Sequence, residues 1–272
     1  FHNIVLVKIR KTYPGQAQKV MNALWGAGQM MFNKILVVTD TDIDLSDSRA
    51  VTRLICSMAH PVEDVIFNRG PVDILDHSSS RFALGSKLGI DATVKLTGEK
   101  VYDENQGDGF NHSHPALADL AINTALIDEK LPVLIIGIDK SLVNQRALHQ
   151  QLFEKGALQG VNWVVYVDPE AVNIRLQDIT WLVANNIDPL RDCFYAKTNL
   201  NTDVPPMAID GSRKSLSADG FRRQWPNVLA MDDETIRQVD ELWGKLGLGE
   251  FIPSPSLNYK GLVKNEGAVA KG

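Results

Sequence analysis

One stretch of the chain, residues 34–95, opens with an apolar run that stops at acidic residues and carries a histidine and a lysine further along. Asp40, Asp42 and Asp44 follow that run at every second position, a pattern that offers carboxylates to a metal ion or to ligand hydroxyl groups. The cluster lacks the glycine and the terminal glutamate of a calcium-binding loop. A solvated turn whose acids cap the following helix is therefore the favoured interpretation.

A histidine and a lysine lie further along the same stretch. His77 follows Asp76, a pairing that suits a general base, and a hydrogen-bonded loop histidine is the alternative. Gly85, Ser86 and Lys87 place a cation after two small residues, which suits a carboxylate or a phosphate. The Walker A pattern and the Gly-x-Gly-x-x-Gly fingerprint are both absent, so the sequence gives no local support for a nucleotide-binding enzyme.

The remaining cysteines and histidines do not form a recognisable metal-binding set. Cys56 and Cys193 lie in apolar segments, where small core residues are expected rather than a disulfide or a metal pair. His112 and His114 would share a face on a strand, but no carboxylate or cysteine completes a ligand set, so a loop is expected. We therefore expect no metal site in this chain, and the cysteine usage favours a cytoplasmic setting.

The elements that position these groups follow a strand–helix–strand–helix order. The run Ile35–Val38 does not alternate with polar residues, which predicts a strand buried on both faces, as in a parallel sheet covered by helices. Ser46 or Asp47 is expected to cap the helix that follows. The predicted elements of the first half are the strands Ile4–Ile9, Ile35–Val38 and Glu63–Phe67 and the helices Gln16–Met31 and Ser48–Ala59.

The second half of the chain repeats this pattern. The apolar run that begins at Ile4 recurs at Val133–Lys140. Asp168 follows Asp40 at the same offset in the numbering at which Asp192 follows Asp64. A register that stays fixed over so long a span predicts a duplicated domain.

Alternating strands and helices predict an α/β fold with two similar three-layer α/β lobes, a C-terminal helix and an extended tail. We expect the first lobe at residues 1–97, a polar linker at 98–115, a degenerate second copy with its closing helix at 116–250 and a tail at 251–272. Within the second copy, residues 116–130 are predicted to be helical.

The composition is that of an ordinary globular protein. The 272 residues, 44% of them hydrophobic, are enough for one large domain or two small ones. The charged fraction of 22% and the net charge of −5 imply no basic face, so nucleic acid is not an expected partner. No apolar run approaches the roughly 20 residues that span a bilayer. The chain begins at Phe1 on a predicted strand, so we expect a fragment of a longer protein.

Several motifs of the first hundred residues occur in one recognisable order. They are Tyr13-Pro14-Gly15-Gln16-Ala17, Lys19-Val20-Met21 followed by Trp25, the segment Gly70-Pro71-Val72-Asp73-Ile74-Leu75-Asp76, and Gly85-Ser86-Lys87-Leu88-Gly89-Ile90-Asp91-Ala92-Thr93. Together they resemble the C-terminal domain of the UbiD-type aromatic acid decarboxylases. The resemblance implies a carboxy-lyase that uses prenylated FMN and a divalent metal on aromatic or unsaturated acids, in ubiquinone or menaquinone synthesis or on phenolic acids.

The same resemblance indicates what lies elsewhere. The family's catalytic glutamates occur in a Glu-Gly-Pro-Tyr-Gly-Asp type motif, with an arginine upstream, and this chain contains neither. The resemblance therefore implies no catalytic residue here, an upstream flavin-binding domain of the same chain as partner, and a fragment that is inactive alone. By position in the motif, Val72 would face the substrate with Pro71 and Ile74 nearby, and Lys87 would lie near an anionic group. Core packing is the alternative for Val72, and no residue is assigned to the flavin.

The C-terminal helix of this family often packs on a neighbouring subunit, so the resemblance also implies a homo-oligomer. A predicted helix at 233–246 carries the apolar stripe Ile236, Val239, Leu242 and Trp243, which suits such an interface. Packing within the chain is the alternative. A non-catalytic module that assembles subunits is accordingly the alternative function.

Overall fold

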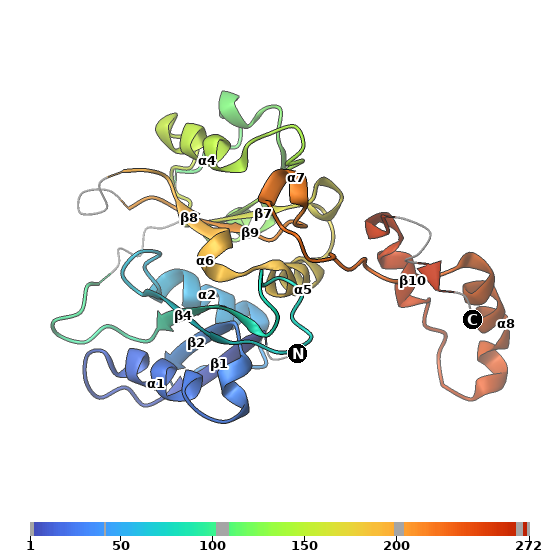
Figure 1. Cartoon of the computed structure of the whole chain (residues 1–272), viewed down its shortest axis with the longest axis horizontal. Coiled ribbons are helices and arrows are strands. Elements are labelled where there is room, and N and C mark those ends of the chain that lie inside the picture. Colours follow the sequence, from blue (N-terminus) through green and yellow to red (C-terminus); the bar gives the residue numbers. More distant parts are fainter. Residues whose placement is uncertain (1–2, 41, 102–108, 199–203, 265–268, 271–272) are drawn as a thin grey trace. The chain divides into compact units, whose positions relative to one another are not determined.

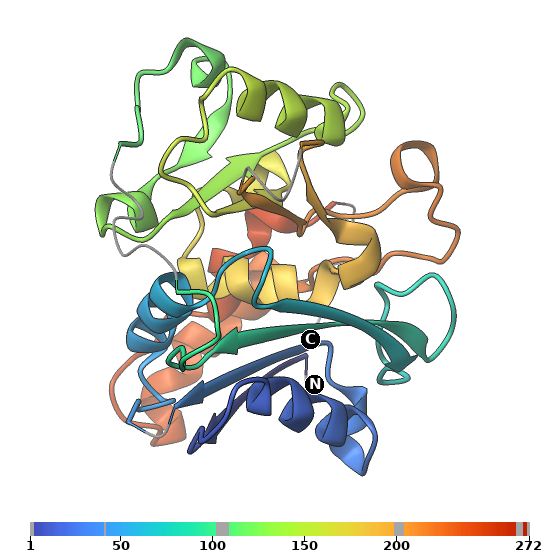
Figure 2. The same cartoon turned by 90° about the vertical axis from the view of Figure 1, so that its left-hand side faces the viewer.

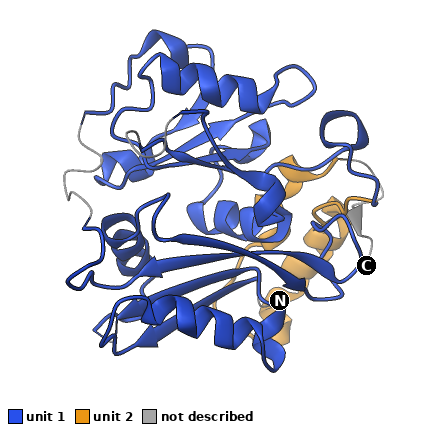
Figure 3. Cartoon of the chain, turned by 60° about the vertical axis from the view of Figure 1, so that its left-hand side comes forward, with its two compact units in different colours: residues 1–223 blue, residues 224–272 orange. Residues whose placement is uncertain are grey.

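The computed structural model describes residues 3–40, 42–101, 109–198, 204–264 and 269–270. Residues 1–223 form one compact unit and residues 224–272 form a second (Figure 3). The larger unit contains a four-stranded and a five-stranded sheet, and each sheet is the centre of one lobe. Part of the predicted linker, residues 102–108, lies outside the described residues.

The first lobe has a four-stranded sheet of order β1-β2-β4-β3. Strands β1, β2 and β4 run parallel, and β3 is antiparallel to β4. The elements are β1 (Ile4–Ile9), α1 (Gln16–Trp25), the 3-10 turn η1 (Gln29–Phe32), β2 (Ile35–Asp40), α2 (Ser48–Met58), β3 (Val65–Pro71) and β4 (Leu84–Ala92).

Helices cover both faces of this sheet, as the unalternating apolar run in β2 predicted. Met21 and Trp25 of α1 pack on Leu36 on one face, and α2 covers the other. The first helix ends at Trp25 and not at Met31, because Gly26 caps it. Asp47 is the cap of α2, and its side chain accepts hydrogen bonds from two backbone N–H groups of the first turn.

The second lobe has a five-stranded sheet of order β5-β6-β7-β9-β8. Strands β6, β7 and β9 run parallel, whereas β5 and β8 are antiparallel edge strands. The elements are the 3-10 turn η2 (Pro115–Leu117), β5 (Ala121–Asn123), α3 (Ala125–Asp128), β6 (Val133–Gly137), α4 (Gln145–Glu154), β7 (Trp163–Val167), η3 (Pro169–Ala171), α5 (Leu176–Asn186), α6 (Pro189–Asp192), β8 (Cys193–Tyr195), β9 (Met207–Asp210) and α7 (Leu216–Asp219).

The two lobes share one topology, which confirms the predicted fold class. Strand β7 begins as far after β2 in the chain as helix α5 begins after α2, so the register of the repeat holds in the structure. Strands β6, β7, β9 and β8 repeat the order and the directions of β1, β2, β4 and β3. The prediction of one helix at 116–130 is wrong. The short strand β5 lies there and adds an edge to the second sheet, and only α3 within that range is α-helical.

The lobes differ most in their antiparallel hairpin. In the first lobe β3 has seven residues and β4 has nine, whereas β8 has three and β9 has four. Residues 199–203, between β8 and β9, lie outside the described residues. The long hairpin is therefore a feature of the first lobe.

The lobes stack on each other through a common apolar core. In Figure 1 the order of layers is α4, the five-stranded sheet, a middle layer with α2, α5 and α6, the four-stranded sheet and α1. Leu88 and Ile90 of β4 belong to the same buried cluster as Trp163 of β7 and Met207 of β9. Each lobe thus covers an apolar sheet face of the other, so the larger unit has a core that neither lobe completes alone.

The smaller unit is built on one long helix. It contains β10 (Ala230–Met231), α8 (Asp233–Leu246), the 3-10 turns η4 (Pro255–Asn258) and η5 (Lys260–Leu262) and β11 (Val269–Ala270). Asp232 caps α8, and the Trp243 indole donates to the carbonyls of Gly249 and Glu250 at 3.2 and 3.1 Å. Strand β11 pairs in parallel with β10, so the predicted tail folds back and groups with the helix. Among the described residues, no helix has the length and hydrophobicity required to cross a bilayer.

Two glycines set how closely the helices approach the central strands. A Cβ on Gly89 would lie 2.4 Å from the Met21 sulfur, and one on Gly211 would lie 2.6 Å from a Val183 methyl group. We therefore expect Gly89→Ala and Gly211→Ala each to lower the unfolding free energy by about 1–3 kcal/mol in urea denaturation. Gly244→Ala in α8, where a Cβ has open space, is the control and should not destabilise. If the unfolding free energy of Gly89→Ala were unchanged, α1 could move away from the strand at little cost, contrary to this prediction.

Candidate functional site

The segment singled out by the sequence, Gly70–Asp76, opens the loop of the long hairpin. Pro71 pairs with Leu84 at the end of β3 and β4, and residues 72–83 form the loop between them. Figure 2 shows this loop projecting from the end of the hairpin. Ala83 has a φ of +55°, a left-handed conformation that costs a residue with a Cβ about 1–2 kcal/mol. Contacts elsewhere must therefore hold the loop in this conformation.

The loop exposes an unusual amount of apolar surface. Ile74, Leu75 and Phe82 are 65%, 74% and 70% exposed, and Leu84 at the base of the hairpin is 44% exposed. Exposed apolar side chains gathered on one short loop are typical of a ligand or protein contact surface. The loop therefore presents an exposed apolar surface.

The predicted substrate-binding residues fall into two classes. Pro71, the last residue of β3, and Ile74, on the loop, are exposed. Val72 is 1% exposed, and its methyl groups lie over Gly85, where a Cβ would come within 3.2 Å of them. Val72 thus packs beneath the loop, and its role toward a substrate stays a prediction.

Lys87 lies in the middle of β4 and is 1% exposed. Its ammonium group donates to the carbonyls of Met31, Asn33 and Pro71 at 2.5, 2.7 and 2.7 Å. Burial lowers the pKa of Lys87 to about 8, and Asp76 acts in the opposite direction. Lys87 therefore fixes the Pro71 end of the loop, and its predicted contact with an anionic group stays a prediction.

A buried ion pair fixes the middle of the loop. Lys34, at the start of β2, places its ammonium nitrogen 2.8 Å from Asp76 Oδ1, and both side chains are 2% exposed. The ammonium group also donates to Ser78 Oγ at 3.0 Å and to the carbonyls of Asn185 and Ile187 at 3.2 and 3.1 Å. Those carbonyls end α5 and have no partner within the helix. One cation therefore joins β2, the loop and the second lobe.

His77 is half-buried on the same loop. Its Nε2 lies 3.3 Å from Asn186 Oδ1 at the end of α5. Burial lowers the pKa of His77, and the hydrogen bond with Asn186 acts in the opposite direction. The Asp76 carboxylate already accepts from Lys34 and from the Ser79 backbone N–H at 2.9 Å. This arrangement favours the hydrogen-bonded loop histidine over the general base.

Asp40 and Asp44 of the acidic cluster accept hydrogen bonds from backbone N–H groups, whereas the cap of α2 is Asp47. Asp44 accepts from the backbone N–H and the hydroxyl of Ser46 at 2.9 and 2.8 Å, and these bonds lower its pKa. Asp40 accepts from the backbone N–H of Val94 at 2.5 Å. Across the described residues, no group of three or more His, Cys, Asp or Glu side chains is placed to hold a metal ion.

Buried charges at the carboxyl end of the first sheet were not foreseen as a group. Lys95 lies 2.8 Å from Asp64 and 3.8 Å from Asp91, and Lys11 lies 3.8 Å from Asp91. Lys11 also contacts Glu99 at 2.6 Å. The four-residue set Lys11, Asp64, Asp91 and Lys95 ties the ends of several strands together.

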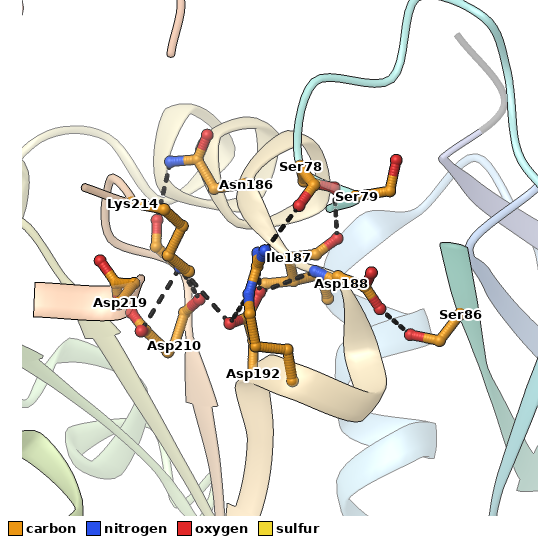
Figure 4. A network of polar contacts seen from close by, with 12 residues as sticks. Ser78, Ser79, Ser86, Asn186, Ile187, Asp188, Asp192, Asp210, Lys214 and Asp219 are labelled. Atoms are coloured by element: carbon orange, nitrogen blue, oxygen red, sulfur yellow. Dashed lines mark hydrogen bonds and ion pairs between the residues drawn. The ribbon is translucent and has the colours of Figure 1, made fainter. Parts of the chain in front are cut away.

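The second lobe contains the same set at matching positions. Lys214 lies 3.7 Å from Asp192 and 3.4 Å from Asp210, and Lys140 lies 3.2 Å from Asp210. Figure 4 shows Asp192, Asp210 and Lys214 together. The signal was available in the sequence, because these residues align with the first set in the repeat. Its recurrence in both lobes points to a structural role.

Two cavities open on the larger unit away from the loop. One, of about 700 Å³, lies between the lobes and is lined by residues of both, mostly from α5 and α2, with apolar side chains such as Ile35 and Ile179 and charged ones such as Arg49 and Arg175. The other, of about 460 Å³, is polar and lies beside the start of α4. Neither is lined by Pro71, Val72, Ile74 or Lys87.

Residues 1–92 match the family model of the 3-octaprenyl-4-hydroxybenzoate carboxy-lyase C-terminal domain, the UbiD C-terminal domain. The matched span contains the whole four-stranded sheet and the loop. The first lobe is therefore similar to the C-terminal domain of the UbiD-type carboxy-lyases, the resemblance that its ordered motifs predicted.

The chain matches parts of longer relatives. An uncharacterised protein of Archaeoglobus fulgidus is 48% identical over 100 residues, which are 36% of this chain and 21% of that protein. An uncharacterised protein of Helicobacter pylori is 28% identical over 256 residues, which cover 88% of this chain and 38% of that protein. A match over 88% of the chain cannot be confined to one lobe. The chain thus spans 21% and 38% of the length of these two relatives.

Similar solved structures include a vanillic acid decarboxylase and a UbiD-class enzyme. The vanillic acid decarboxylase of Sedimentibacter hydroxybenzoicus in its open form is 28% identical, with 38% of this chain and 22% of that chain covered and a TM-score of 0.35. The UbiD-class enzyme HmfF from Pelotomaculum thermopropionicum, in complex with FMN, is 26% identical, with 38% and 24% covered and a TM-score of 0.32.

Removing the cation of the buried pair should destabilise the larger unit strongly. Lys34→Met leaves the Asp76 carboxylate buried without its counter-ion, so we expect the unfolding free energy in urea to fall by about 3–5 kcal/mol. Lys100→Met, which breaks an exposed pair with Glu63, is the matched control and should cost less than about 1 kcal/mol. Equal losses in the two variants would contradict the role of the buried pair.

The same pair predicts an acid-dependent stability. Burial alone would raise the pKa of Asp76, but Lys34 and the hydrogen bonds from Ser79 lower it to about 2, below the 3.8 of a free carboxyl. The folded state therefore binds fewer protons, and the stabilisation is present above pH 4 and lost as the pH falls toward 2. The stability difference between wild type and Asp76→Asn should shrink by about 2 kcal/mol over this range. A difference that does not vary with pH would contradict this assignment.

Proposed function

We propose that this chain is the C-terminal part of a decarboxylase that uses prenylated FMN to act on an aromatic or unsaturated carboxylic acid, of the quinone-biosynthesis type. The observation that carries the proposal is the match of residues 1–92 to the carboxy-lyase C-terminal domain. In this proposal the loop at residues 72–83 forms one wall of the substrate pocket. The catalytic residues lie in an upstream flavin-binding domain of the same chain.

The chemistry of the loop supports this role. Aromatic rings and unsaturated chains are apolar, and Ile74 and Phe82 offer exposed apolar side chains against which such a molecule can pack. Pro71 is exposed beside them. Val72 and Lys87 act from beneath, Val72 by filling the space under the loop and Lys87 by holding the Pro71 carbonyl.

The family's cofactors need residues from outside this chain. The donor sets of the described residues do not fit a divalent metal, because His, Cys, Asp and Glu side chains do not gather in threes there. We therefore place the ligands of the metal and of the prenylated FMN phosphate in the upstream domain. This chain contributes the pocket wall and no catalytic group. We also propose a cytoplasmic protein, a setting consistent with the two buried free cysteines, Cys56 and Cys193.

Assembly of subunits is the second candidate function, and the smaller unit favours it. Val239, Leu242 and Leu246 on α8 are 44%, 47% and 50% exposed. A groove of about 370 Å³ runs beside them, lined by residues that include Ile236 and Trp243. In the decarboxylase proposal this surface joins the subunits of a homo-oligomer. In the alternative, such assembly is the whole function of the chain.

The proposal predicts activity in the longer parent protein and none in this chain alone. Reconstituted with prenylated FMN, the parent should release CO2 from members of a panel of aromatic and unsaturated acids. The complete absence of CO2 release would leave the assembly role as the better proposal, and decarboxylation by this chain alone would contradict the placement of the catalytic groups.

A single substitution tests the pocket wall. Ile74→Asp in the parent should raise KM by about tenfold with little change in kcat, because a carboxylate on the wall repels an acid substrate and would itself lose its hydration when the substrate binds. Leu142→Asp, at an apolar residue of the second lobe that is 80% exposed, is the matched control and should leave KM unchanged. Identical kinetics in the two variants would contradict the wall.

A further inference from the structure

The second lobe reaches across to the backbone of the loop at several points. Arg191 of α6 donates to the Ser78 carbonyl at 2.8 Å. The Ser78 hydroxyl in turn donates to the Ile187 carbonyl at 2.8 Å. Figure 4 shows Ser78 beside Ile187 at the junction of the two lobes. These contacts come from residues more than a hundred positions away in the chain, so the loop does not depend on its own hairpin alone.

Arg223, which follows the last helix of the second lobe, contacts the same part of the loop. Its guanidinium donates to the Ser79 carbonyl at 2.7 Å, to Ser79 Oγ at 3.3 Å and to the Asp76 carbonyl at 3.1 Å. A planar guanidinium that binds two carbonyls of one loop, here those of Asp76 and Ser79, fixes their relative position better than a lysine would. Arg223 thus acts as a clamp on residues 76–79.

The base of the hairpin is held by the same lobe. Ser86 of β4 is hydrogen-bonded to the Asp188 carboxylate and accepts from the backbone N–H of Leu190 at 2.8 Å. Asp188 is the cap residue of α6, and Figure 4 shows it facing Ser86. The loop is therefore held in its middle by Arg191 and Arg223 and at its base by Asp188.

The loop needs such support. It contains a residue in a left-handed conformation, Ala83, and it exposes Ile74, Leu75 and Phe82, whose burial cannot stabilise it. An isolated loop of this length would sample many conformations. The external contacts converge on residues 76–79, next to the apolar side chains that the loop presents.

We propose that Arg191 and Arg223 are positioning residues, through which the degenerate second lobe holds the loop in the conformation that presents Ile74, Leu75 and Phe82. The functional part of this inference rests on the proposed pocket wall. The second lobe then has a role of its own: it keeps a surface of the first lobe ordered. The hairpin of the second lobe is short, and helix α6, which follows α5, supplies Arg191 as one of the two clamps.

Hydrogen exchange of the loop amides tests the positioning without reference to catalysis. The reporters are the N–H groups of Asp76 and Ser79, which are hydrogen-bonded to Asp73 O and Asp76 Oδ2 at 2.9 Å. In the whole chain, Arg223→Met should speed exchange over residues 73–83 by about tenfold and leave β4 unchanged. The matched control is Arg222→Met, which removes the same charge one position earlier, from an exposed side chain that makes no hydrogen bond to the loop in the described structure.

Each outcome decides the inference. Unchanged loop exchange in Arg223→Met, or equal acceleration in Arg222→Met, would overturn it. If Arg223→Met does not fold, Arg223→Lys against Arg222→Lys gives the same comparison with the charge kept, and faster loop exchange in Arg223→Lys alone is the expected result. Equal loop exchange in the two lysine variants would overturn the inference.

A second readout separates the inference from the proposed function. In the reconstituted parent enzyme, Arg223→Met should raise KM by about tenfold with kcat changed less than about threefold, because a disordered wall weakens binding and not chemistry. Faster exchange with an unchanged KM would support the positioning of the loop and contradict the pocket wall. Unchanged exchange with a raised KM would overturn the positioning and leave the pocket wall supported.

Discussion

The ammonium group of Lys34 has to be neutralised where two lobes and a loop meet. It lies at the first position before β2, so it cannot leave the interior without displacing the central strand of the first sheet. Its partners are the Asp76 carboxylate and Ser78 hydroxyl on the loop and the last carbonyls of α5. Those carbonyls lack partners within the helix, and a cation satisfies them while compensating the negative end of the helix dipole. One group thereby fixes the relative positions of three segments, and the lobe stacking and the loop conformation both depend on it.

The order of elements and the duplication could be predicted because they leave local or periodic traces. Apolar periodicity indicated β1, β2, α1 and α2, and the pairs Asp40–Asp168 and Asp64–Asp192 fixed the offset that the structure shows between α2 and α5. The β3–β4 hairpin left a weaker trace. Gly85, Ser86 and Lys87 have low strand propensity, and only the ladder to β3 and the carbonyls around Lys87 make them a central strand.

The candidate site was found in the sequence by motif and not by chemistry. The conspicuous ionisable residues, the acids at the end of β2 and His77, make local turns and hydrogen bonds. The candidate contact surface consists instead of the exposed apolar side chains of the loop. Lys34, Arg191 and Arg223 were missed, because each is a single basic residue whose partners lie far away in the chain. Only the folded chain brings such residues together, and no local pattern marks them.

The distance along the chain between the loop and its clamps also sets an order of events during synthesis. Ser79 and Arg223 are 144 residues apart, and Ser78 and Arg191 are 113 apart. At about 5–20 residues per second, a ribosome adds the 144 residues between Ser79 and Arg223 in roughly 7–30 s. The first lobe can therefore pair its strands well before the residues that hold its loop exist. During that interval Ile74, Leu75 and Phe82 sit on a loop that lacks its clamps, so the nascent chain exposes this apolar surface before the second lobe can order it.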